Sequence, residues 1–497
     1  MTSPRNKQDG EGAQPDNSLD QEASHQTVSS EGTESEKGSR LKEFMSAPNR
    51  AVWRLATPMM LGMVVHMAYM IVDTAFIGHL GREALAAATF VGPLFFFIIA
   101  LISGLTTATT ALVAQSIGRR DYQGAERVAG GAVFIGLVGG VVFAGALFYS
   151  GPHILRALGA GGESARLAWS YFRIVSLGMV LFFFSAALRA VLTGEGDTRT
   201  PVIVMIIASF INGGLDPVFI FVLDMGIAGA AVATLCAQVF TTLVLGYLLF
   251  VRRRSVVKLE LKNIRFYAPL FWGLLSIGLP TTAGQLVMST GQALYNRLLS
   301  GFGEYAVAAY GAASKIDMIV AMPLFGLAAA SVSLIGMFAG AKRSDLVRYT
   351  ALYAYRWAII ISVSVGISAV LASRWVLRLF TDDALVIETG RVYLYFVVFG
   401  YPMMAFGMTT GRILQGLGHG LPSFIITSVR VLGVGVTLAY LAVYVFDAPI
   451  EAVWGSIVVG GLISNVLSFF WVRRIVWRGD PTKRASGKSP RLARARR

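Results

Sequence analysis

The chain has 497 residues, of which 55% are hydrophobic and only 14% charged, and its formal net charge is +15. Apolar runs of about 20 residues or more recur along most of its length, which excludes a soluble globular protein and a wholly disordered one. The positive charge alone would suit a nucleic-acid partner. However, the basic residues gather between the apolar runs, which favours a topology signal instead.

About twelve apolar runs could each cross a bilayer as a helix rising about 1.5 Å per residue. The sequence thus predicts an all-α polytopic membrane protein. In chain order the runs cover roughly 51–78, 88–117, 124–149, 165–189, 201–222, 226–251, 269–299, 305–338, 347–372, 388–412, 422–445 and 451–472.

The runs divide into two lobes of six, with polar segments around them. Residues 1–39 contain almost no large apolar groups, which predicts a disordered leader. Residues 40–251 form the predicted N-terminal lobe, 252–268 an inter-lobe linker, 269–474 the C-terminal lobe and 475–497 a basic tail. Alternate connections are basic, as at Arg119, Arg252 and Lys342, so the positive-inside bias places the leader, linker, tail and both termini in the cytoplasm of a plasma-membrane protein.

The two lobes repeat one another at a constant offset of 222 residues. Pro58 recurs as Pro280, Gly118 as Gly340 and Tyr171 as Tyr393. An even number of helices in each copy gives both copies the same orientation in the membrane, related by a pseudo-two-fold axis along the membrane normal. Internal repeats of this kind are typical of secondary transporters.

Ionisable residues inside the apolar runs are the main functional signal, because a carboxylate in hydrocarbon costs roughly 2.5–3.5 kcal/mol on insertion scales. Asp73 lies in the first run, and Asn212 and Asp216 share one face of the fifth. Tyr171 and Thr234 should lie at a comparable depth and offer hydroxyl groups.

The duplication breaks at these residues. At the 222-residue offset, Asp73 corresponds to Tyr295 and Asp216 to Leu438. A residue needed only for folding would be expected in both copies. The sequence therefore predicts a cation or proton site in the N-terminal lobe alone. If the ion is Na⁺, its predicted ligands are Asp73, Asn212, Asp216 and Thr234.

Other residues of the first and fifth runs suggest how such a site could work. His66 lies two turns before Asp73 and could titrate near neutral pH in a proton path, or simply pack. Pro58 offers a kink that could be a moving hinge or a static bend, and Pro217 frees a carbonyl beside Asp216.

Candidates for a substrate path are less specific. Met63, Met67 and Met70 follow one helix face and would suit varied apolar ligands, although ordinary helix packing also explains them. Lys315 and Asp317 in the eighth run either line the path or form an ion pair with another helix, for which Arg173 and Arg297 are potential partners.

The chain resembles the multidrug and toxic compound extrusion (MATE) transporters, and within them the DinF-like branch. The resemblance covers about residues 50–475 and is carried by VDTAFIGHLG at 72–81, ALAA at 84–87, AQSIG at 114–118, RAVLTGEGDTRTP at 189–201 and NGGLDP at 212–217. It implies two six-helix lobes around a central cleft, export driven by inward H⁺ or Na⁺, and a first-lobe pocket made of Asp73, Asn212, Asp216, Tyr171 and Thr234.

The chain also departs from the family pattern. Other branches carry a glutamate on the seventh helix and an acid on the tenth, whereas here the seventh offers only Gln285 and the tenth has no acid. This difference argues against a second-lobe cation site and leaves Gln285 as a candidate for the substrate path.

We therefore expect a monomeric secondary exporter of amphipathic, cationic compounds that is not an enzyme, has no cofactor apart from its coupling ion, and binds small molecules and lipid rather than nucleic acid. A lipid-linked oligosaccharide flippase of the same superfamily is the alternative, which would require an arginine-lined central cleft. A membrane transferase is a third class. Its only weak candidates are Glu195 and Asp197, which the neighbouring glycines and Pro201 place in a turn.

Overall fold

The computed structural model describes residues 39–252 and 255–484. Most of the predicted leader and the last part of the predicted basic tail lie outside the described residues. Within them the chain is almost entirely helical, and no strand is assigned in this part of the chain.

The first half begins with helical residues 39–46 and continues through seven α-helices and two short π-helical segments. Several helices end where a glycine interrupts the apolar pattern. Their bounds are α2 Pro48–Gly78, α3 Arg82–Gly118, α4 Tyr122–Ala157, α5 Gly162–Leu177, α6 Met179–Gly194, α7 Arg199–Pro217, η1 Val218–Val222, α8 Ile227–Gly246 and η2 Tyr247–Val251.

The second half follows a linker that contains the short 3₁₀ helix η3 (Leu261–Asn263). Its elements are α9 Ala268–Ser300, α10 Glu304–Gly340, α11 Ser344–Arg378, α12 Ala384–Val397, α13 Gly400–Gly416, α14 Gly420–Ser428, η4 Val429–Val436, α15 Thr437–Phe446, α16 Ile450–Val472 and η5 Arg473–Arg478.

Ten of the described helices, counted with their π-helical continuations, are long and apolar enough to cross a membrane, and the number rises to 12 when each of two bent pairs counts as one span. The pairs are α5 with α6, bent by 47°, and α12 with α13, bent by 56°. The sequence did not predict these bends, which fall at Gly178 and just before Gly400. The chain is a multi-pass membrane protein, and the predicted fold class is confirmed.

The two halves contact each other through equivalent residues of the internal repeat. Gly118 on α3 and Gly340 on α10 occupy equivalent positions of the repeat. A Cβ atom at Gly118 would lie 2.0 Å from the Met337 carbonyl oxygen, and one at Gly340 would lie 2.1 Å from the Gln115 carbonyl oxygen. Since Gln115 and Met337 are themselves equivalent, the contact is reciprocal, as a two-fold axis between α3 and α10 requires.

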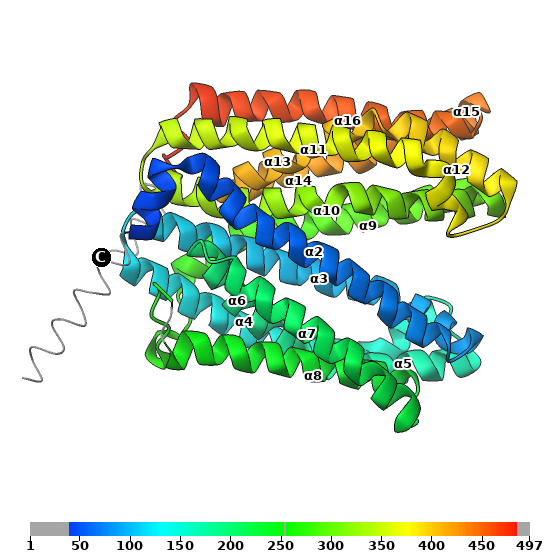
Figure 1. The fold of residues 1–497 in the computed structure, drawn as a ribbon, viewed down its shortest axis with the longest axis horizontal. Helices are drawn as coiled ribbons and strands as arrows, with labels where there is room; N and C mark the ends of the chain where they lie inside the picture. The colour runs from blue at the N-terminus through cyan, green and yellow to red at the C-terminus, as the bar shows by residue number, and fades with distance from the viewer. Residues whose placement is uncertain (1–38, 253–254, 485–497) are drawn as a thin grey trace, which may run out of the picture.

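The first membrane-spanning helix of each half packs against helices of both halves. α2 contacts α10 and α7, and the equivalent α9 contacts α3 and α14. In Figure 1, α2 runs diagonally from the second-half helices toward α7. The early α2 residues Val52 and Leu55 share a buried cluster with Leu327 and Leu334 of α10.

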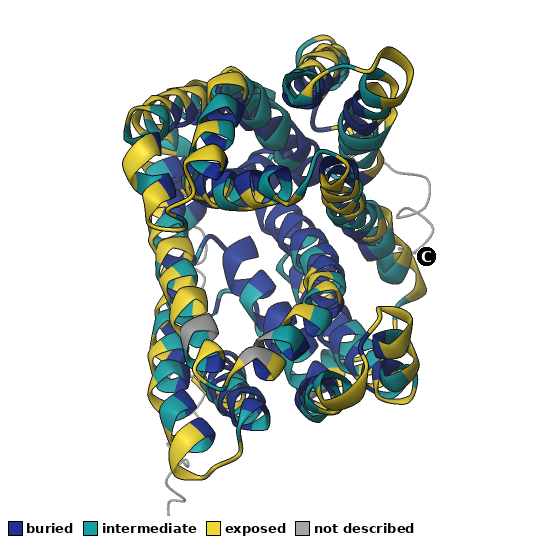
Figure 2. Cartoon of the chain, turned by 90° about the vertical axis from the view of Figure 1, so that its right-hand side faces the viewer, coloured by how far each residue is buried: buried dark blue, intermediate teal, exposed yellow. Residues whose placement is uncertain are grey.

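The helices of the two halves converge at one end and diverge toward the other (Figure 1). The converging end carries the basic turns at Arg119 and Lys342 and is called the basic end below. Across it, Gln115 Nε2 donates to the Gly416 carbonyl oxygen at 2.8 Å. Viewed from the opposite end, Figure 2 shows buried segments toward the interior and exposed segments around the rim.

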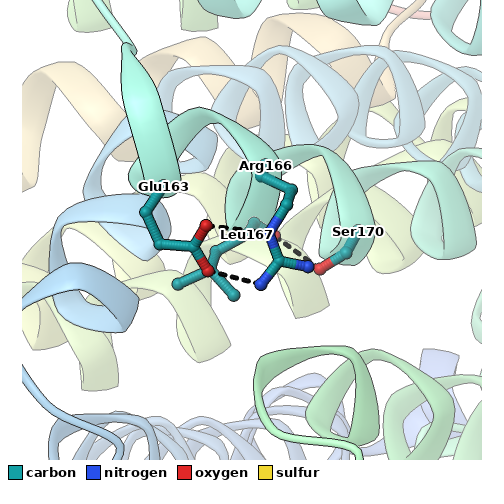
Figure 3. Close-up of polar contacts among 4 residues, drawn as sticks. All are labelled: Glu163, Arg166, Leu167 and Ser170. Carbon is teal, nitrogen blue, oxygen red and sulfur yellow. Dashed lines mark hydrogen bonds and ion pairs between the residues drawn. The ribbon is translucent and has the colours of Figure 1, made fainter.

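Exposed ion pairs occur near the opposite end of the helices, in α5 and α12. On α5 the guanidinium of Arg166 meets the carboxylate of Glu163, with an Nε to Oε2 distance of 2.8 Å (Figure 3). Ser170, one turn further, donates to the Leu167 carbonyl oxygen rather than joining the pair. On α12, Arg391 pairs with Glu388. Such exposed pairs contribute little to stability.

The linker between the halves is fixed by Glu195, which directly follows α6. The buried carboxylate accepts hydrogen bonds from the Ser255 hydroxyl and, at 2.7 Å, from the Val256 backbone N–H. Gly196 adopts a positive φ of 79°, which creates the predicted turn. Glu195 therefore holds the linker against the first half, and its carboxylate is already engaged by backbone and hydroxyl donors.

The pKa of Glu195 makes this contact pH-dependent. Burial raises the pKa to about 7 against the opposing effect of the Ser255 and Val256 hydrogen bonds. Between its ordinary value of 4.5 and about 7, the folded protein holds a proton that the unfolded chain releases. The contribution to stability therefore falls as pH rises through this window, by on the order of 3 kcal/mol.

Glu195→Gln should remove most of that pH dependence, because the glutamine stays neutral. We expect the unfolding temperature of the detergent-solubilised variant to change less between about pH 5 and pH 8 than that of the parent protein. Glu163→Gln, on an exposed surface, is the matched control and should keep the parent slope. Equal slopes in all three proteins would contradict the assignment.

Candidate functional site

Three polar side chains of α2 and α7 meet inside the first half. The carboxyl groups of Asp73 and Asp216 lie within hydrogen-bonding reach of each other. Asn212 lies one turn before Asp216, and its Nδ2 donates to Asp216 Oδ1 at 3.4 Å. Asn212 is 2% exposed and Asp216 is 0% exposed. We call Asp73, Asn212 and Asp216 the acid cluster.

The acid cluster has more acceptor atoms than donors. Asp73 Oδ1, Asn212 Oδ1 and Asp216 Oδ2 are buried, and none has a hydrogen-bond partner among the described residues. Because an ionised carboxylate can only accept hydrogen bonds, two adjoining carboxylates need a shared proton or a cation between them. The three oxygen atoms are suitable ligands for either.

Hydroxyl groups surround the acid cluster. A hydrogen bond joins the Tyr69 hydroxyl to Thr234 on α8, and Thr234 Oγ1 donates its own proton to the Ala230 carbonyl oxygen at 2.9 Å. The buried Tyr171 on α5 lies close enough to Asp73, Asp216 and Tyr69 to interact electrostatically with all three. The structure thus brings together all five residues of the predicted pocket.

Tyr69 belongs to this group, although the sequence analysis missed it. It precedes Asp73 by four residues and therefore lies on the same face of α2. That spacing was the signal that could have identified it. Lying next to Asp73 and bonded to Thr234, Tyr69 links α2 to α8 beside the acid cluster.

The other first-half candidates lie along α2 and at the end of α7. His66 interacts electrostatically with Arg189 of α6, and the His66 ring centroid lies 6.0 Å from that of Tyr69. α2 continues as a helix through Pro58. Pro217 ends α7 and, having no N–H, leaves the Gly213 carbonyl without its usual helical donor.

The methionines of α2 do not share one environment. Met63 is 36% exposed and Met70 is 45% exposed, whereas Met67 is half-buried. Gly62, next to Met63, packs against Met205 and Val202 of α7.

Asp317 and Lys315 on α10 face different surroundings. Asp317 accepts hydrogen bonds from the hydroxyls of Tyr393 at 2.5 Å and Tyr401 at 2.7 Å, whereas Lys315 is exposed. Neither Arg173 nor Arg297 forms an ion pair with Asp317 among the described residues. Tyr393 corresponds to Tyr171 in the repeat, so each half has a carboxylate beside this tyrosine.

Replacing Asp317 should destabilise the second half. In Asp317→Asn the amide nitrogen cannot accept a hydrogen bond, so one buried tyrosine hydroxyl loses its partner. We expect a loss of about 1–3 kcal/mol, seen as a lower unfolding temperature. Lys315→Gln, two residues away on the same helix, is the control and should leave that temperature unchanged. An unaltered unfolding temperature in Asp317→Asn would contradict the role given to the two tyrosines.

Gln285 lies in a different place from the acid cluster. It lines a cavity of about 210 Å³ in the second half, together with residues of α10, α13, α14, η4 and α16. Arg412 and Arg430 also line this cavity, and the sequence analysis identified neither of them.

One protein-family model matches the chain twice, once in each half. The MatE family model matches residues 58–218 and again residues 280–441, so the second match starts 222 residues after the first. The two matches together cover more than half of the chain. The chain belongs to the MatE family of transporters. The predicted duplication and family are confirmed.

Relatives match the MatE chain over most of its length. The probable multidrug resistance protein NorM of Thermotoga maritima is 26% identical over 449 residues, which cover 88% of this chain and 96% of that protein. A crystal structure of MATE in the bent conformation has a TM-score of 0.84 at 32% identity and covers 90% of this chain and 98% of that chain.

A solved structure described as the outward-facing conformation of a multidrug resistance MATE family transporter has a TM-score of 0.83 at 33% identity. It covers 86% of this chain and 96% of that chain. The DinF-like branch remains a prediction.

Proposed function

We propose that this protein is a secondary active exporter that moves amphipathic compounds, cationic ones included, out of the cell against an inward flow of H⁺ or Na⁺. The observation that carries the proposal is the acid cluster, whose three buried oxygen atoms have no hydrogen-bond partner among the described residues. Buried, unpaired oxygen ligands within a membrane span mark a site for a coupling ion.

The ion would act by changing the contact between α2 and α7. With the site empty, two adjoining carboxylates repel each other in a medium of low dielectric constant. One proton or one Na⁺ bound between Asp73 and Asp216 removes that repulsion and draws the helices together. The Tyr69–Thr234 hydrogen bond ties α8 to the same movement. Pro58 supplies a site on α2 where the backbone can bend.

The direction of transport depends on which end of the protein faces the cytoplasm. The basic turns at Arg119 and Lys342 support placing the basic end, and with it both termini, in the cytoplasm, in a plasma-membrane protein. In that orientation the two halves meet on the cytoplasmic side and diverge on the outer side (Figure 1). The similarity to a structure described as outward-facing is consistent with this assignment.

The names of the relatives support the substrate class. The Thermotoga maritima relative is named as a probable multidrug resistance protein, and relatives from Staphylococcus aureus are named multidrug export proteins. They favour export of small molecules over flipping of lipid-linked oligosaccharides. We propose that the exporter works as a monomer, contacts lipid, and uses no cofactor other than its coupling ion.

Transport into inside-out vesicles with separately imposed gradients tests the proposal. We expect a fluorescent lipophilic cation to accumulate when a proton gradient or a sodium gradient is imposed, and not when neither is. Whichever gradient drives accumulation identifies the ion. Accumulation that is independent of both gradients would exclude cation-coupled export.

His66 is tested in the same assay. If His66 takes part in the proton path, His66→Gln should shift the pH profile of transport while leaving transport at the optimum largely intact. An unchanged profile would exclude that role.

A further inference from the structure

The cavity of the second half contains two positively charged side chains. Arg412 extends from α13 and Arg430 from η4 into a space of about 210 Å³. Buried Thr281 and Gln415 form a polar part of its wall, whereas Met288 is 42% exposed and Phe325 is 38% exposed. The cavity therefore has a polar interior and an apolar, open side.

Neither guanidinium has a negatively charged partner in the part of the chain that the structure describes. Arg412 Nη1 donates to Thr107 Oγ1 at 2.9 Å and to Gln415 Oε1 at 3.4 Å. Arg430 Nη2 contacts Met288 Sδ, a weak acceptor, at 3.0 Å. None of the ion pairs among the described residues includes Arg412 or Arg430, and no Asp or Glu lines the cavity.

Each guanidinium carries five N–H donors in a planar arrangement that matches a carboxylate or phosphate. Charged side chains at membrane depth are costly when unpaired, and those that occur there mark binding sites by default. Two unpaired guanidinium groups in one cavity point to an anionic ligand.

The internal repeat supports a specific role. At the 222-residue offset, Arg412 corresponds to Ala190 and Arg430 to Ala208. Packing of the duplicated fold therefore does not require either arginine. The two arginines thus occur only in the second half. The acids of the acid cluster, in contrast, occur only in the first half, and the equivalent positions of the second half carry an apolar residue or a tyrosine.

We propose that this cavity binds the anionic head group, a phosphate or a carboxylate, of an amphipathic compound whose chain leaves past Met288 and Phe325. A volume of about 210 Å³ suits a head group rather than a whole drug-sized molecule, for which pockets of about 300–1,000 Å³ are usual. The inference deepens the proposed export function by adding an anionic substrate class, and it rests on that function for the export of the bound compound.

Equilibrium binding to the purified full-length protein tests the site without any gradient. The probes are radiolabelled dodecyl phosphate and dodecyltrimethylammonium, which share a chain and differ in the charge of the head group. We expect Arg430→Gln and Arg412→Gln each to weaken dodecyl phosphate binding at least tenfold and to leave binding of the cation within about twofold. Lysine at either position should restore part of the affinity.

Arg374→Gln is the matched control, since Arg374 is an exposed arginine on α11 of the same half. It should bind dodecyl phosphate as the parent protein does. The proposal is overturned if dodecyl phosphate binds no more tightly than dodecanol, or if both cavity variants that elute as folded protein bind it with parental affinity. If one glutamine variant does not fold, dodecyl phosphate binding to the lysine variant at that position and to the other glutamine variant tests the proposal instead.

Competition distinguishes the source of the head group. Displacement of dodecyl phosphate by phosphatidylglycerol but not by phosphatidylcholine would identify a lipid, whereas resistance to both would identify a free amphiphile. Both results retain an anionic ligand. Asp73→Asn separates the two proposals: it should abolish export yet preserve dodecyl phosphate binding, so a failure of coupling leaves the cavity assignment standing.

Discussion

Asp216→Asn is expected to abolish gradient-driven export, reducing it to the level of vesicles without the protein. The asparagine cannot carry the negative charge that attracts a proton or Na⁺, and Asn212 Nδ2 loses its charged acceptor at 3.4 Å. Asp73→Asn should have the same effect, because the two carboxyl groups form one site. Uptake of a lipophilic cation into inside-out vesicles under the driving gradient measures both variants.

The control for Asp216→Asn lies eight residues further along the chain. Asp224 is exposed and has a φ of 51°, a left-handed conformation that asparagine also tolerates. Asp224→Asn should transport at the parental rate. Membrane expression and elution volume should be alike in all variants. Near-parental transport in both Asp73→Asn and Asp216→Asn would refute the coupling site.

The second large effect is expected at the contact between α3 and α10. Gly118→Ala and Gly340→Ala each add a Cβ atom about 2 Å from a backbone carbonyl oxygen, at distances of 2.0 Å and 2.1 Å. Because backbone atoms cannot rotate away, the helices must separate. We expect each substitution to destabilise the protein by at least about 1–3 kcal/mol, the range for overpacking, as measured by its unfolding temperature.

Gly145→Ala on α4 is the matched control, since nothing lies within 4 Å of its added Cβ atom. There alanine should be neutral or slightly stabilising, because it restricts the unfolded chain more than glycine does. The two interface variants should also resemble each other, because their contacts are equivalent under the repeat. Unchanged stability in both interface variants would contradict the close approach.

The repeat made much of the fold predictable. α3 and α10 begin and end at positions related by the 222-residue offset, from Arg82 and Glu304 to Gly118 and Gly340. The bends at Gly178 and before Gly400 were not predicted, although both glycines belong to the repeat. A glycine permits a bend without specifying an angle, and the angle depends on the packing of neighbouring helices.

The candidate site was predictable where burying a charge is costly. Asp73 and Asp216 stood out because acids are rare in apolar runs, and the structure brings them together. Tyr69 did not stand out in the sequence, since tyrosines in membrane helices are common and often only pack against neighbouring helices. Arg412 was missed because it ends its predicted run, where an arginine can reach the interface. Arg430 lies inside the eleventh run, and only the three-dimensional arrangement places both arginines in one cavity.

The position of α2 has a consequence for the order of events in a transport cycle. Its first turns are embedded among the second-half helices, while Asp73 near its far end touches α7 of the first half. A single continuous helix is thus anchored in one body and carries one carboxylate of the acid cluster, whose other two residues belong to the other body. Under the proposed coupling, a rotation of one body against the other that α2 does not absorb by bending at Pro58 changes the spacing between Asp73 and Asp216, so reorientation and ion release would form a single geometric step.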